Sequence, residues 1–275
     1  MSDAAVGDGL KPVPTGWAVA LTIAGSDPSG GAGIQADLKT FHQFGVYGAA
    51  ALTLATVQNT VGVGGIEFLP PDFVLAQIRA VVSDIPPLAA KTGALGNAAM
   101  VEAVAAAAAE FRFPLVVDPV MISKHGVPLL AEEARRAIEL CLLPHAALVT
   151  PNLHEASALV GAEVATLEAM REAARRIHGM GARAVLVKGG HLEGAAIDLL
   201  FDGLAFQEFA GERIATRHTH GTGCSYSAAI TAQLARGVAL GDAVAGAKRW
   251  ISEAIRTNPG LGAGSGPVNH FAKVF

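Results

Sequence analysis

Short runs of apolar residues alternate along this chain with stretches in which apolar residues recur at helical spacing. The first apolar run, WAVALTIA, covers residues 17–24 and ends in the glycine-rich segment GSDPSGGAG. Ile34, Leu38 and Phe41 then follow at intervals of four and three residues. This opening segment therefore predicts a strand, a glycine loop and a helix, in that order.

The same pattern of strand and helix recurs through most of the chain. Further short strands are predicted at residues 49–57, 88–95, 114–120, 146–151 and 184–188. Helices are predicted between them, at residues 71–83, 97–111, 131–142 and 167–180. Strands that alternate with helices favour a mostly parallel sheet with crossover helices, which is the α/β class.

The pattern changes over residues 197–216, where short apolar runs joined by Asp-Gly and Gly-Glu predict an antiparallel hairpin at one edge of the sheet. The last third of the chain closes with helices. No proline-rich linker or shift in charge divides the sequence, so residues 17–275 are predicted to form one domain. Residues 1–16 have no basic start followed by an unbroken apolar stretch, and we expect a flexible tail there without a secretory signal.

Polar and glycine residues stand directly after several of the predicted strands. In an open parallel sheet, ligands bind beyond the carboxyl ends of the strands. That rule gathers five features along one edge: the glycine segment at 25–33, Gln58, Asp118, Asn152 and Lys188. Turn chemistry explains any one of them alone, but together they indicate a binding site.

Two glycine-rich segments are candidate anion sites. GAGIQA at residues 31–36 formally matches the dinucleotide-binding pattern, which makes a nicotinamide oxidoreductase a rival hypothesis. The match is weak, because QNT at residues 58–60 stands where that pattern needs an acidic residue for the ribose. THGTGCS at residues 219–225 precedes a predicted helix, and its backbone N–H groups suit a phosphate. A tight entry into a packed helix is the alternative interpretation.

Three other residues raise questions of chemistry. Cys224 lies in the first turn of that helix, where the helix dipole is expected to lower the pKa of the thiol, so Cys224 is a candidate base. Cys141 is surrounded by aliphatic residues and is expected to be a core residue. Asp37 shares the apolar face of the first helix; its carboxylate either lies in the open first turns or points into a pocket and accepts a ligand hydrogen bond.

Asn152 and Glu155 stand three residues apart at the start of a predicted helix. The pair suits a hydrated Mg²⁺ ion, and it also suits a capping box, which needs no ligand. Asp118 and Lys188 on the same edge favour the metal, because a hard cation binds carboxylate oxygens and an ammonium suits phosphate. The nine histidines show no zinc-ligand spacing.

Net charge and hydropathy limit the classes of binding partner that the protein is expected to have. Twenty Lys and Arg against 24 Asp and Glu give a net charge of −4, without the basic excess that nucleic-acid binding requires. The apolar runs are too short to span a membrane, so no membrane association is expected. Two cysteines are too few for a disulfide framework, and a chain without a secretory signal is expected to be cytoplasmic and to keep both cysteines reduced.

Taken in order, the motifs resemble those of the hydroxymethylpyrimidine/phosphomethylpyrimidine kinases of thiamine biosynthesis. The resemblance is carried by TIAGSDPSGGAGIQADLKT at 22–40, VQNT at 57–60, VDPVM at 117–121, TPNL at 150–153, VKGGH at 187–191 and HGTGCS at 220–225. It runs from about residue 21 to GPVNHF at residues 266–271. It implies a ribokinase-like, three-layer α/β/α fold with a central mostly parallel sheet, and a homodimer. It also implies two successive ATP-dependent phosphorylations, of the pyrimidine alcohol and then of its monophosphate.

The resemblance also assigns roles to individual residues. Gln58 is expected to read the aminopyrimidine ring, with Gly25, Asp37 and Val120 around it. The positions at the ATP phosphates and the Mg²⁺ ion are matched by Lys188, Asn152, Glu155 and Asp118, and those of the anion hole by Gly221, Thr222 and Gly223. Cys224 stands where most ribokinase relatives have an aspartate base, and residues 124–126 are expected to form part of a lid.

Three positions depart from the family pattern. Ala94 stands beside the expected pyrimidine where a methionine is common, and Thr56 replaces an aliphatic residue or alanine, which implies a roomier ring site. His154 stands near the metal motif where proline is frequent. Ala94 leaves open a pyridoxal or pyridoxine kinase, and a pyrimidine-binding regulator without catalysis is a further alternative.

Overall fold

A single sheet organises the computed structural model, which describes residues 16–121, 132–190 and 196–274. Within those residues the sheet has nine strands in the order β3-β2-β1-β4-β5-β6-β7-β8-β9. The strands are β1 Val19–Ser26, β2 Tyr47–Gln58, β3 Val63–Phe68, β4 Ala89–Thr92, β5 Leu115–Val117, β6 Leu148–Val149, β7 Val185–Gly189, β8 Ala196–Phe201 and β9 Phe206–Gly211. The central strands, in the order β2-β1-β4-β5-β6-β7, are parallel to one another. At the two edges, β3 pairs antiparallel with β2, β8 with β7, and β9 with β8.

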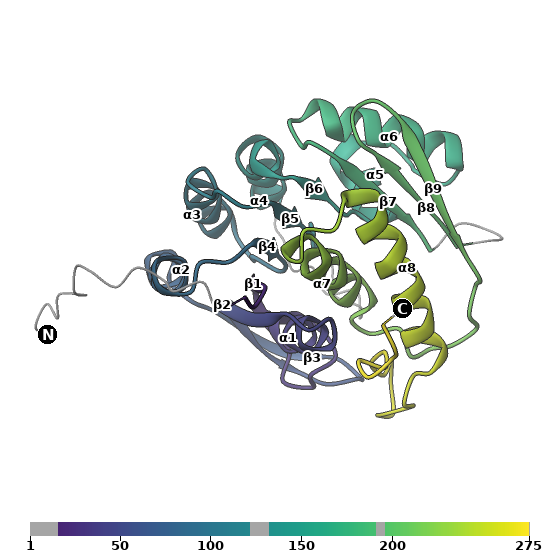
Figure 1. Ribbon diagram of the computed structural model, residues 1–275, viewed down its shortest axis with the longest axis horizontal. Coiled ribbons are helices and arrows are strands. Elements are labelled where there is room, and N and C mark those ends of the chain that lie inside the picture. The colour runs from purple at the N-terminus through teal and green to yellow at the C-terminus, as the bar shows by residue number, and fades with distance from the viewer. Residues whose placement is uncertain (1–15, 122–131, 191–195, 275) are drawn as a thin grey trace, which may run out of the picture.

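Helices cover both faces of this sheet (Figure 1). On one face lie α2 Pro71–Asp84, α3 Ala98–Ala108, α4 Glu132–Ala137, the π-helical turn η1 Ile138–Leu142, the 3₁₀ turn η2 Leu143–His145, α5 Leu153–Val160 and α6 Leu167–Gly179. On the other lie α1 Gly33–Gln43, α7 Thr222–Ala235 and α8 Leu240–Arg256. The predicted three-layer α/β/α fold with a mostly parallel sheet is therefore confirmed.

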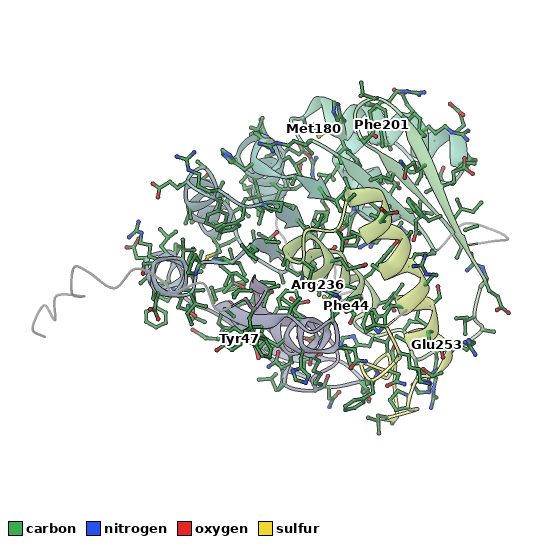
Figure 2. All side chains as sticks on the ribbon, in the orientation of Figure 1. Phe44, Tyr47, Met180, Phe201, Arg236 and Glu253 are labelled. Atoms are coloured by element: carbon green, nitrogen blue, oxygen red, sulfur yellow. The ribbon has the colours of Figure 1, made fainter. Side chains whose placement is uncertain are left out.

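The strands are apolar on both sides because both faces of the sheet are buried. In β5, Leu115 and Val117 join the core under α2 to α6, whereas Val116 between them joins the core under α1, α7 and α8. In the second core, Phe44 packs edge-on against Trp250 with ring centroids 5.3 Å apart, and Arg236 donates to the Phe44 carbonyl at 3.4 Å (Figure 2). These contacts tie α1, α7 and α8 into one layer.

Most predicted elements occur where the hydrophobic pattern places them, including the edge hairpin, which forms β8 and β9. One strand was missed: β3, whose sequence VGGIEF contains two glycines that weaken the strand pattern. The helix predicted over residues 131–142 begins as α4 and ends in the π-helical turn η1. Residues 124–126, and all of the expected tail 1–16 except Gly16, lie outside the described residues.

The order of the strands defines where a ligand fits. The chain passes from β1 to β2 on one side and later places β4 on the other side of β1, so the winding direction reverses between β1 and β4. The carboxyl ends of strands at such a reversal border the binding crevice of open α/β sheets. None of the helices in the described part of the chain has the length and apolarity to cross a bilayer.

Candidate functional site

The loop after β1 is built around the buried carboxylate of Asp27. Its Oδ1 accepts hydrogen bonds from the backbone N–H and the hydroxyl of Ser29, at 2.9 and 2.7 Å, and its Oδ2 accepts the Ala32 N–H at 2.9 Å. Gly33, the first residue of α1, has a φ of +60°, and a Cβ there would lie 2.3 Å from the carbonyl oxygen of Gly25. Glycine is therefore required for the loop to turn directly into the helix.

The loop before α7 lies against this first loop. Gly221 caps α7 with a φ of +74°, and a Cβ there would lie 1.7 Å from the carbonyl oxygen of Gly31. A Cβ at Gly223 would lie 3.3 Å from Lys188 Nζ and 3.8 Å from Asp118 Oδ2. The glycines of the second loop thus bring the N-terminus of α7, with its unpaired N–H groups, beside a lysine ammonium.

Lys188 and its neighbours form a charged group, here called the Lys188 cluster: Asp118, Asn152, Glu155, Lys188 and Cys224. Lys188 Nζ lies 3.1 Å from Asp118 Oδ1, and the backbones of Asn152 and Lys188 form a parallel bridge. The prediction that Asp118, Asn152 and Lys188 lie together at one edge of the sheet is therefore confirmed.

Asp118 is held by further donors. Thr150 donates to its Oδ1 at 3.3 Å, and the Ser227 hydroxyl lies 3.2 Å from its Oδ2 and 3.0 Å from the Cys224 carbonyl oxygen. Burial would lower the pKa of Lys188, but Asp118 and Glu155 outweigh that effect and raise it. The ammonium is therefore charged at neutral pH and available to an anion.

Asn152 and Glu155 form the capping box that the sequence left as one of two interpretations. The Asn152 side chain accepts the Glu155 N–H at 2.9 Å, and the Glu155 carboxylate accepts the Asn152 N–H at 2.8 Å. Burial raises the pKa of Glu155 to about 7, with Asp118 adding to the rise and Lys188 opposing it. Capping the helix and holding a cation are compatible here, because a carboxylate has more than one lone pair on each oxygen.

The side chains of the Lys188 cluster suit a Mg²⁺ ion that is bound together with phosphates. No group of three or more His, Cys, Asp or Glu that could hold an ion occurs in residues 16–121, 132–190 and 196–274. A Mg²⁺ ion that arrives with phosphates needs only one or two carboxylates, because phosphate oxygens and waters complete its shell. Asp118 and Glu155, both beside Lys188, fit such an ion and do not fit a metal caged by the protein alone.

The expectation that the helix dipole lowers the pKa of Cys224 is wrong. Burial raises the pKa of this thiol to about 12, and Asp37 and Asp118 add to the rise, although Lys91 opposes it. Desolvation of a thiolate outweighs the helix N-terminus at this position. Cys224 is a protonated thiol at neutral pH.

The structure contradicts one interpretation of Asp37, because the side chain does not lie in open first turns of the helix. The side chain is fully buried; its Oδ2 accepts from Lys91 Nζ at 2.8 Å and from the Thr22 hydroxyl at 2.6 Å. Burial raises the pKa of Asp37 even though the Lys91 ammonium opposes that rise. The Asp37 Oδ1 atom has no hydrogen-bond partner in the described part of the chain, so its acceptance of a ligand hydrogen bond stays a prediction. The buried Lys91 beneath Cys224 and Asp118 is a neighbour that the sequence did not indicate.

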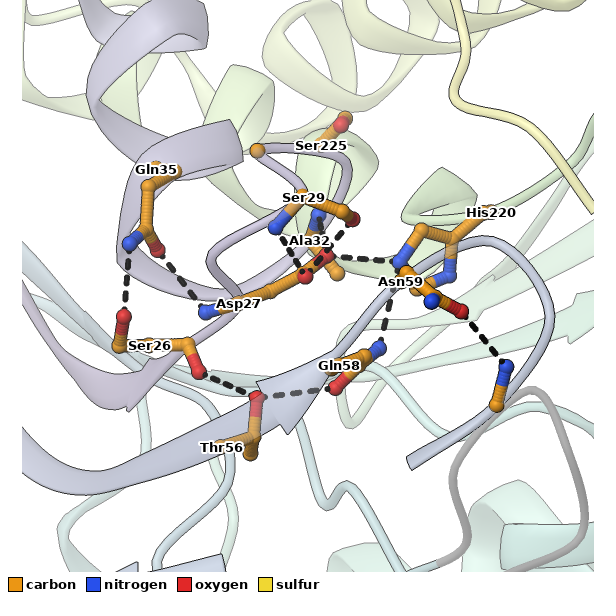
Figure 3. A network of polar contacts seen from close by, with 12 residues as sticks. Ser26, Asp27, Ser29, Ala32, Gln35, Thr56, Gln58, Asn59, His220 and Ser225 are labelled. Carbon is orange, nitrogen blue, oxygen red and sulfur yellow. Dashed lines mark hydrogen bonds and ion pairs between the residues drawn. The ribbon is translucent and has the colours of Figure 1, made fainter. Parts of the chain in front are cut away.

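Gln58 belongs to a second group, here called the Gln58 cluster: Ser26, Asp27, Thr56, Gln58 and His220 (Figure 3). His220 Nε2 lies 2.7 Å from Asp27 Oδ2 and 3.4 Å from the Gln58 amide nitrogen. Thr56 Oγ1 lies 2.9 Å from the Ser26 carbonyl oxygen and 3.2 Å from Gln58 Oε1. The network joins the end of β2, the first loop and the second loop.

The remaining predicted ring residues occupy the same edge of the sheet. Gly25 is buried in β1, and a Cβ there would lie 2.6 Å from the Leu54 side chain. Val120 is half-buried after β5, and the half-buried Ala94 follows β4. His154 is exposed on α5, and Cys141 packs against the core, as predicted.

Sequence reasoning did not assign roles to Asp27 and His220, although both lie within the quoted motifs. They are 193 positions apart, and no spacing rule pairs them. A pocket of about 390 Å³ lies elsewhere, between β9 and α8, and no predicted site residue lines it.

Comparisons with known proteins agree with this geometry. The family described as phosphomethylpyrimidine kinase matches residues 27–269. The hydroxymethylpyrimidine/phosphomethylpyrimidine kinase of Bacillus subtilis is 46% identical over 256 residues, which cover 92% of this chain and 94% of that protein. A thiamine biosynthesis bifunctional protein of Geobacter sulfurreducens is 53% identical over 252 residues; the match covers 91% of this chain but only 51% of that longer protein.

Two solved structures have the same ribokinase-like fold. The ADP complex of Bacillus subtilis pyridoxal kinase matches with a TM-score of 0.87 and 41% identity, covering 93% of this chain and 98% of that one. Staphylococcus aureus pyridoxal kinase with AMP-PCP and pyridoxal matches with a TM-score of 0.85 and 36% identity, covering 93% of this chain and 94% of that one. By its sequence and its fold, this chain belongs to the phosphomethylpyrimidine kinase family.

Proposed function

We propose that this chain transfers the γ-phosphoryl group of ATP to the hydroxyl of hydroxymethylpyrimidine, and then a second phosphoryl group to the monophosphate formed. The observation that carries the proposal is the approach of Gly223 to Lys188 and Asp118 at the N-terminus of α7, next to the loop that holds Gln58 in its network. A cation, helix N–H groups and carboxylates at one point are what phosphoryl transfer needs for alignment and charge neutralisation.

The Lys188 cluster and the second loop would hold the triphosphate. The N–H groups at Gly221, Thr222 and Gly223 would donate hydrogen bonds to the oxygens of the transferred group, the Thr222 N–H giving up its bond to the Thr219 carbonyl oxygen. The Lys188 ammonium would neutralise the charge that develops on the group. Asn152, bridged to Lys188 through the backbone, would lie beside the same phosphates. Asp118 and Glu155 would hold a Mg²⁺ ion, which when bound shields the phosphate charges.

The acceptor alcohol would lie between the two loops. Gln58 would hydrogen-bond the ring, with Thr56, Gly25, Val120 and Ala94 around it. Asp37 would also hold the Lys91 ammonium in place beneath Cys224 and Asp118. Cys224 is a protonated thiol, so it would orient the acceptor hydroxyl. Late in a loose transition state, Cys224 Sγ would take the hydroxyl proton as the thiol hydrogen passes to an oxygen of the transferred phosphoryl group.

The direct test is phosphorylation by the full-length chain. With ATP, Mg²⁺ and the aminopyrimidine alcohol, mass spectrometry should show the monophosphate first and the diphosphate later, in step with ADP release. The Lys188→Met variant is the control for phosphorylation by a contaminant. Pyrimidine bound without ADP release would instead identify a non-catalytic regulator.

A pyridoxal or pyridoxine kinase is the second candidate. The similarity to two pyridoxal kinases and the small Ala94 side chain favour it. Equal concentrations of the aminopyrimidine alcohol and pyridoxal in one reaction separate the two functions. We expect the pyrimidine phosphate to dominate, and a marked excess of pyridoxal phosphate would reassign the substrate.

Two further proposals concern the state of the protein. A homodimer and a cytoplasmic location remain predictions, and the edge hairpin formed by β8 and β9 is one candidate surface for the dimer. Sedimentation of the wild-type chain and of a variant with a charge introduced at the exposed Leu204, in the turn between those strands, would test that surface. A dimer that persists in this variant would move the interface elsewhere.

A further inference from the structure

A short segment after α8 lies between the turn that follows Gln58 and the second loop. Residues 261–267, at the yellow end of the chain in Figure 1, are here called the C-terminal strap. The strap is irregular in conformation except for one parallel bridge between His220 and Pro267. Because the strap has so little regular structure, its position depends on individual contacts with its neighbours.

The first contacts tie the strap to the turn after Gln58, residues 59–62. The Ser265 N–H donates to the Thr60 carbonyl oxygen at 2.9 Å, and the Gly264 N–H donates to the Thr60 hydroxyl at 3.3 Å. A Cβ at Gly264 would lie 2.0 Å from the Thr60 carbonyl oxygen. Only glycine therefore lets the strap come this close to the turn.

The remaining contacts tie the strap to the second loop. The Ser265 hydroxyl donates to the Arg217 carbonyl oxygen at 2.8 Å. The Gly266 carbonyl oxygen accepts the His220 N–H at 3.0 Å, and His220 directly precedes Gly221, the residue that caps α7. The strap thus reaches the backbone that carries the expected anion hole.

Ser265 joins both sets of contacts, because its N–H bonds the turn and its hydroxyl bonds the second loop. Phosphoryl transfer requires the attacking oxygen to be aligned with the γ-phosphorus, and a misplacement of about 1 Å can cost about 10²-fold in rate. We propose that the C-terminal strap is a positioning element that holds the acceptor side of the site in register with the phosphate side, with Ser265 as the residue that joins them.

The inference rests on the proposed function for the reaction that is aligned, but the link between the two sides can be measured without substrate. In Gly264→Ala the added Cβ would meet Thr60 and Val61 and no residue of the second loop. If the strap couples the two sides, the His220 amide of the full-length variant should nevertheless exchange its hydrogen about fivefold faster, the factor expected for one lost hydrogen bond. Faster exchange confined to residues 59–62 would overturn the coupling.

The same variant tests the alignment. With ATP, Mg²⁺ and the aminopyrimidine alcohol, formation of the pyrimidine phosphate should fall about 10²-fold in Gly264→Ala. ATP beside a displaced acceptor would lose its phosphoryl group to water: the water oxygen bonds the γ-phosphorus, the bond to ADP breaks and the water proton passes to solvent. The amount of ADP released per pyrimidine phosphate should therefore rise severalfold, which a loss of folded protein alone would not cause.

Gly62→Ala is the matched control, because Gly62 lies in the same turn and a Cβ there would meet open space. Both the exchange of the His220 amide and the ratio of ADP to product should stay within about twofold of wild type. Ser265→Ala, which removes the bond to Arg217, should change both quantities in the same direction as Gly264→Ala but by less.

Ser265→Ala decides the question alone if Gly264→Ala does not fold. Its own control is Ser83→Ala, which removes an exposed hydroxyl that bonds the Ala80 carbonyl within α2. With an active wild type, an unchanged ratio of ADP to product in the strap variants would overturn the positioning role alone. A wild type that phosphorylates no pyrimidine would overturn the proposed function, and the exchange of the His220 amide would still decide whether the strap couples the two sides.

Discussion

The Gln58 cluster and the Lys188 cluster lie at the same edge of the sheet but are built from different interactions. The Gln58 cluster is a network that joins one carboxylate, one imidazole, one hydroxyl and one amide through polar contacts of 2.7 to 3.4 Å. The Lys188 cluster concentrates charges, and burial shifts the pKa of Glu155 and of Cys224 upward. The Gln58 cluster is suited to selecting the ring of the acceptor, and the Lys188 cluster to stabilising the charge that develops during phosphoryl transfer.

This difference predicts that variants separate into two kinds. Loss of a directional contact weakens the recognition of one substrate, whereas loss of a preorganised charge slows the chemical step. If both clusters act on one reaction, a single phosphorylation assay should show weaker substrate recognition in variants of the Gln58 cluster and a slower chemical step in variants of the Lys188 cluster.

The largest effect is expected from Lys188→Met. Removing the cation beside Gly223 should lower kcat about 10³-fold with little change in the KM for the pyrimidine, because the charge acts mainly on the transition state. Steady-state kinetics measure both constants. The exposed Lys273→Met is the control and should behave as wild type; a kcat within threefold of wild type for Lys188→Met would contradict the role.

Lys91→Met should be the most destabilising of these substitutions. It leaves the buried Asp37 carboxylate without its ion-pair partner, which costs about 3 to 5 kcal/mol in the free energy of unfolding. Urea denaturation measures the loss, and the double variant with Asp37→Asn should recover part of it. A loss below about 1 kcal/mol would show that the pair contributes little.

Gln58→Ala should reduce kcat/KM for the aminopyrimidine alcohol about 10²-fold, because ring hydrogen bonds are lost. The KM for the pyrimidine should rise and the KM for ATP should stay within threefold of wild type, whereas Lys188→Met is expected to leave the KM for the pyrimidine nearly unchanged. Gln43→Ala removes a glutamine that bonds the Ala272 carbonyl, away from the ring, and serves as the control. Equal losses for both substrates would break the proposed division between the clusters.

Cys224→Ala should lower kcat about 10²-fold and raise the KM for the pyrimidine only slightly. The second phosphorylation should be less affected, because its acceptor is already a phosphate. Cys141→Ala, in the core on the other side of the sheet, should retain the wild-type kcat. An unchanged kcat in Cys224→Ala would remove the thiol from the chemistry.

The last prediction concerns Glu155 and leaves the chemical step aside, because it appears only in the dependence of stability on pH. Because its pKa is raised to about 7 in the folded state, the folded chain binds more protons than the unfolded chain between about pH 4.5 and pH 7. The stability that Glu155 contributes is thus present below pH 4.5 and is lost as the pH rises through 7.

Thermal and urea unfolding of wild type and Glu155→Gln, without Mg²⁺, should show this loss only in wild type. The difference between the two free energies of unfolding should change by up to about 3 kcal/mol from pH 5 to pH 8. Parallel pH curves would mean that Glu155 is ionised throughout.

The two clusters also differ in how far the sequence predicts them. Apolar runs located the strands, and the rule for carboxyl ends brought Asp118, Asn152 and Lys188 together correctly. Local patterns suffice there, because each residue lies at the carboxyl end of its own strand or within three residues after it.

Pairs that form only through the tertiary fold could not be found in this way. Asp37 and Lys91 are 54 positions apart, and Asp27 and His220 are 193 apart. The pKa of Cys224 was mispredicted for a related reason: the helix N-terminus is visible in the sequence, whereas the burial that outweighs it is not. Of the strands, β3 was missed because its glycines interrupt the apolar pattern.

The central claim is that the two clusters serve one transfer from ATP to the pyrimidine, and labelled ATP tests it most directly. Wild-type chain is given ATP with ¹⁸O in the three non-bridging γ-phosphoryl oxygens, together with the aminopyrimidine alcohol, and the product is weighed by mass spectrometry. We expect pyrimidine monophosphate that retains all three labelled oxygens, with its formation reduced in both Lys188→Met and Gln58→Ala. Labelled inorganic phosphate with unmodified pyrimidine would contradict the account.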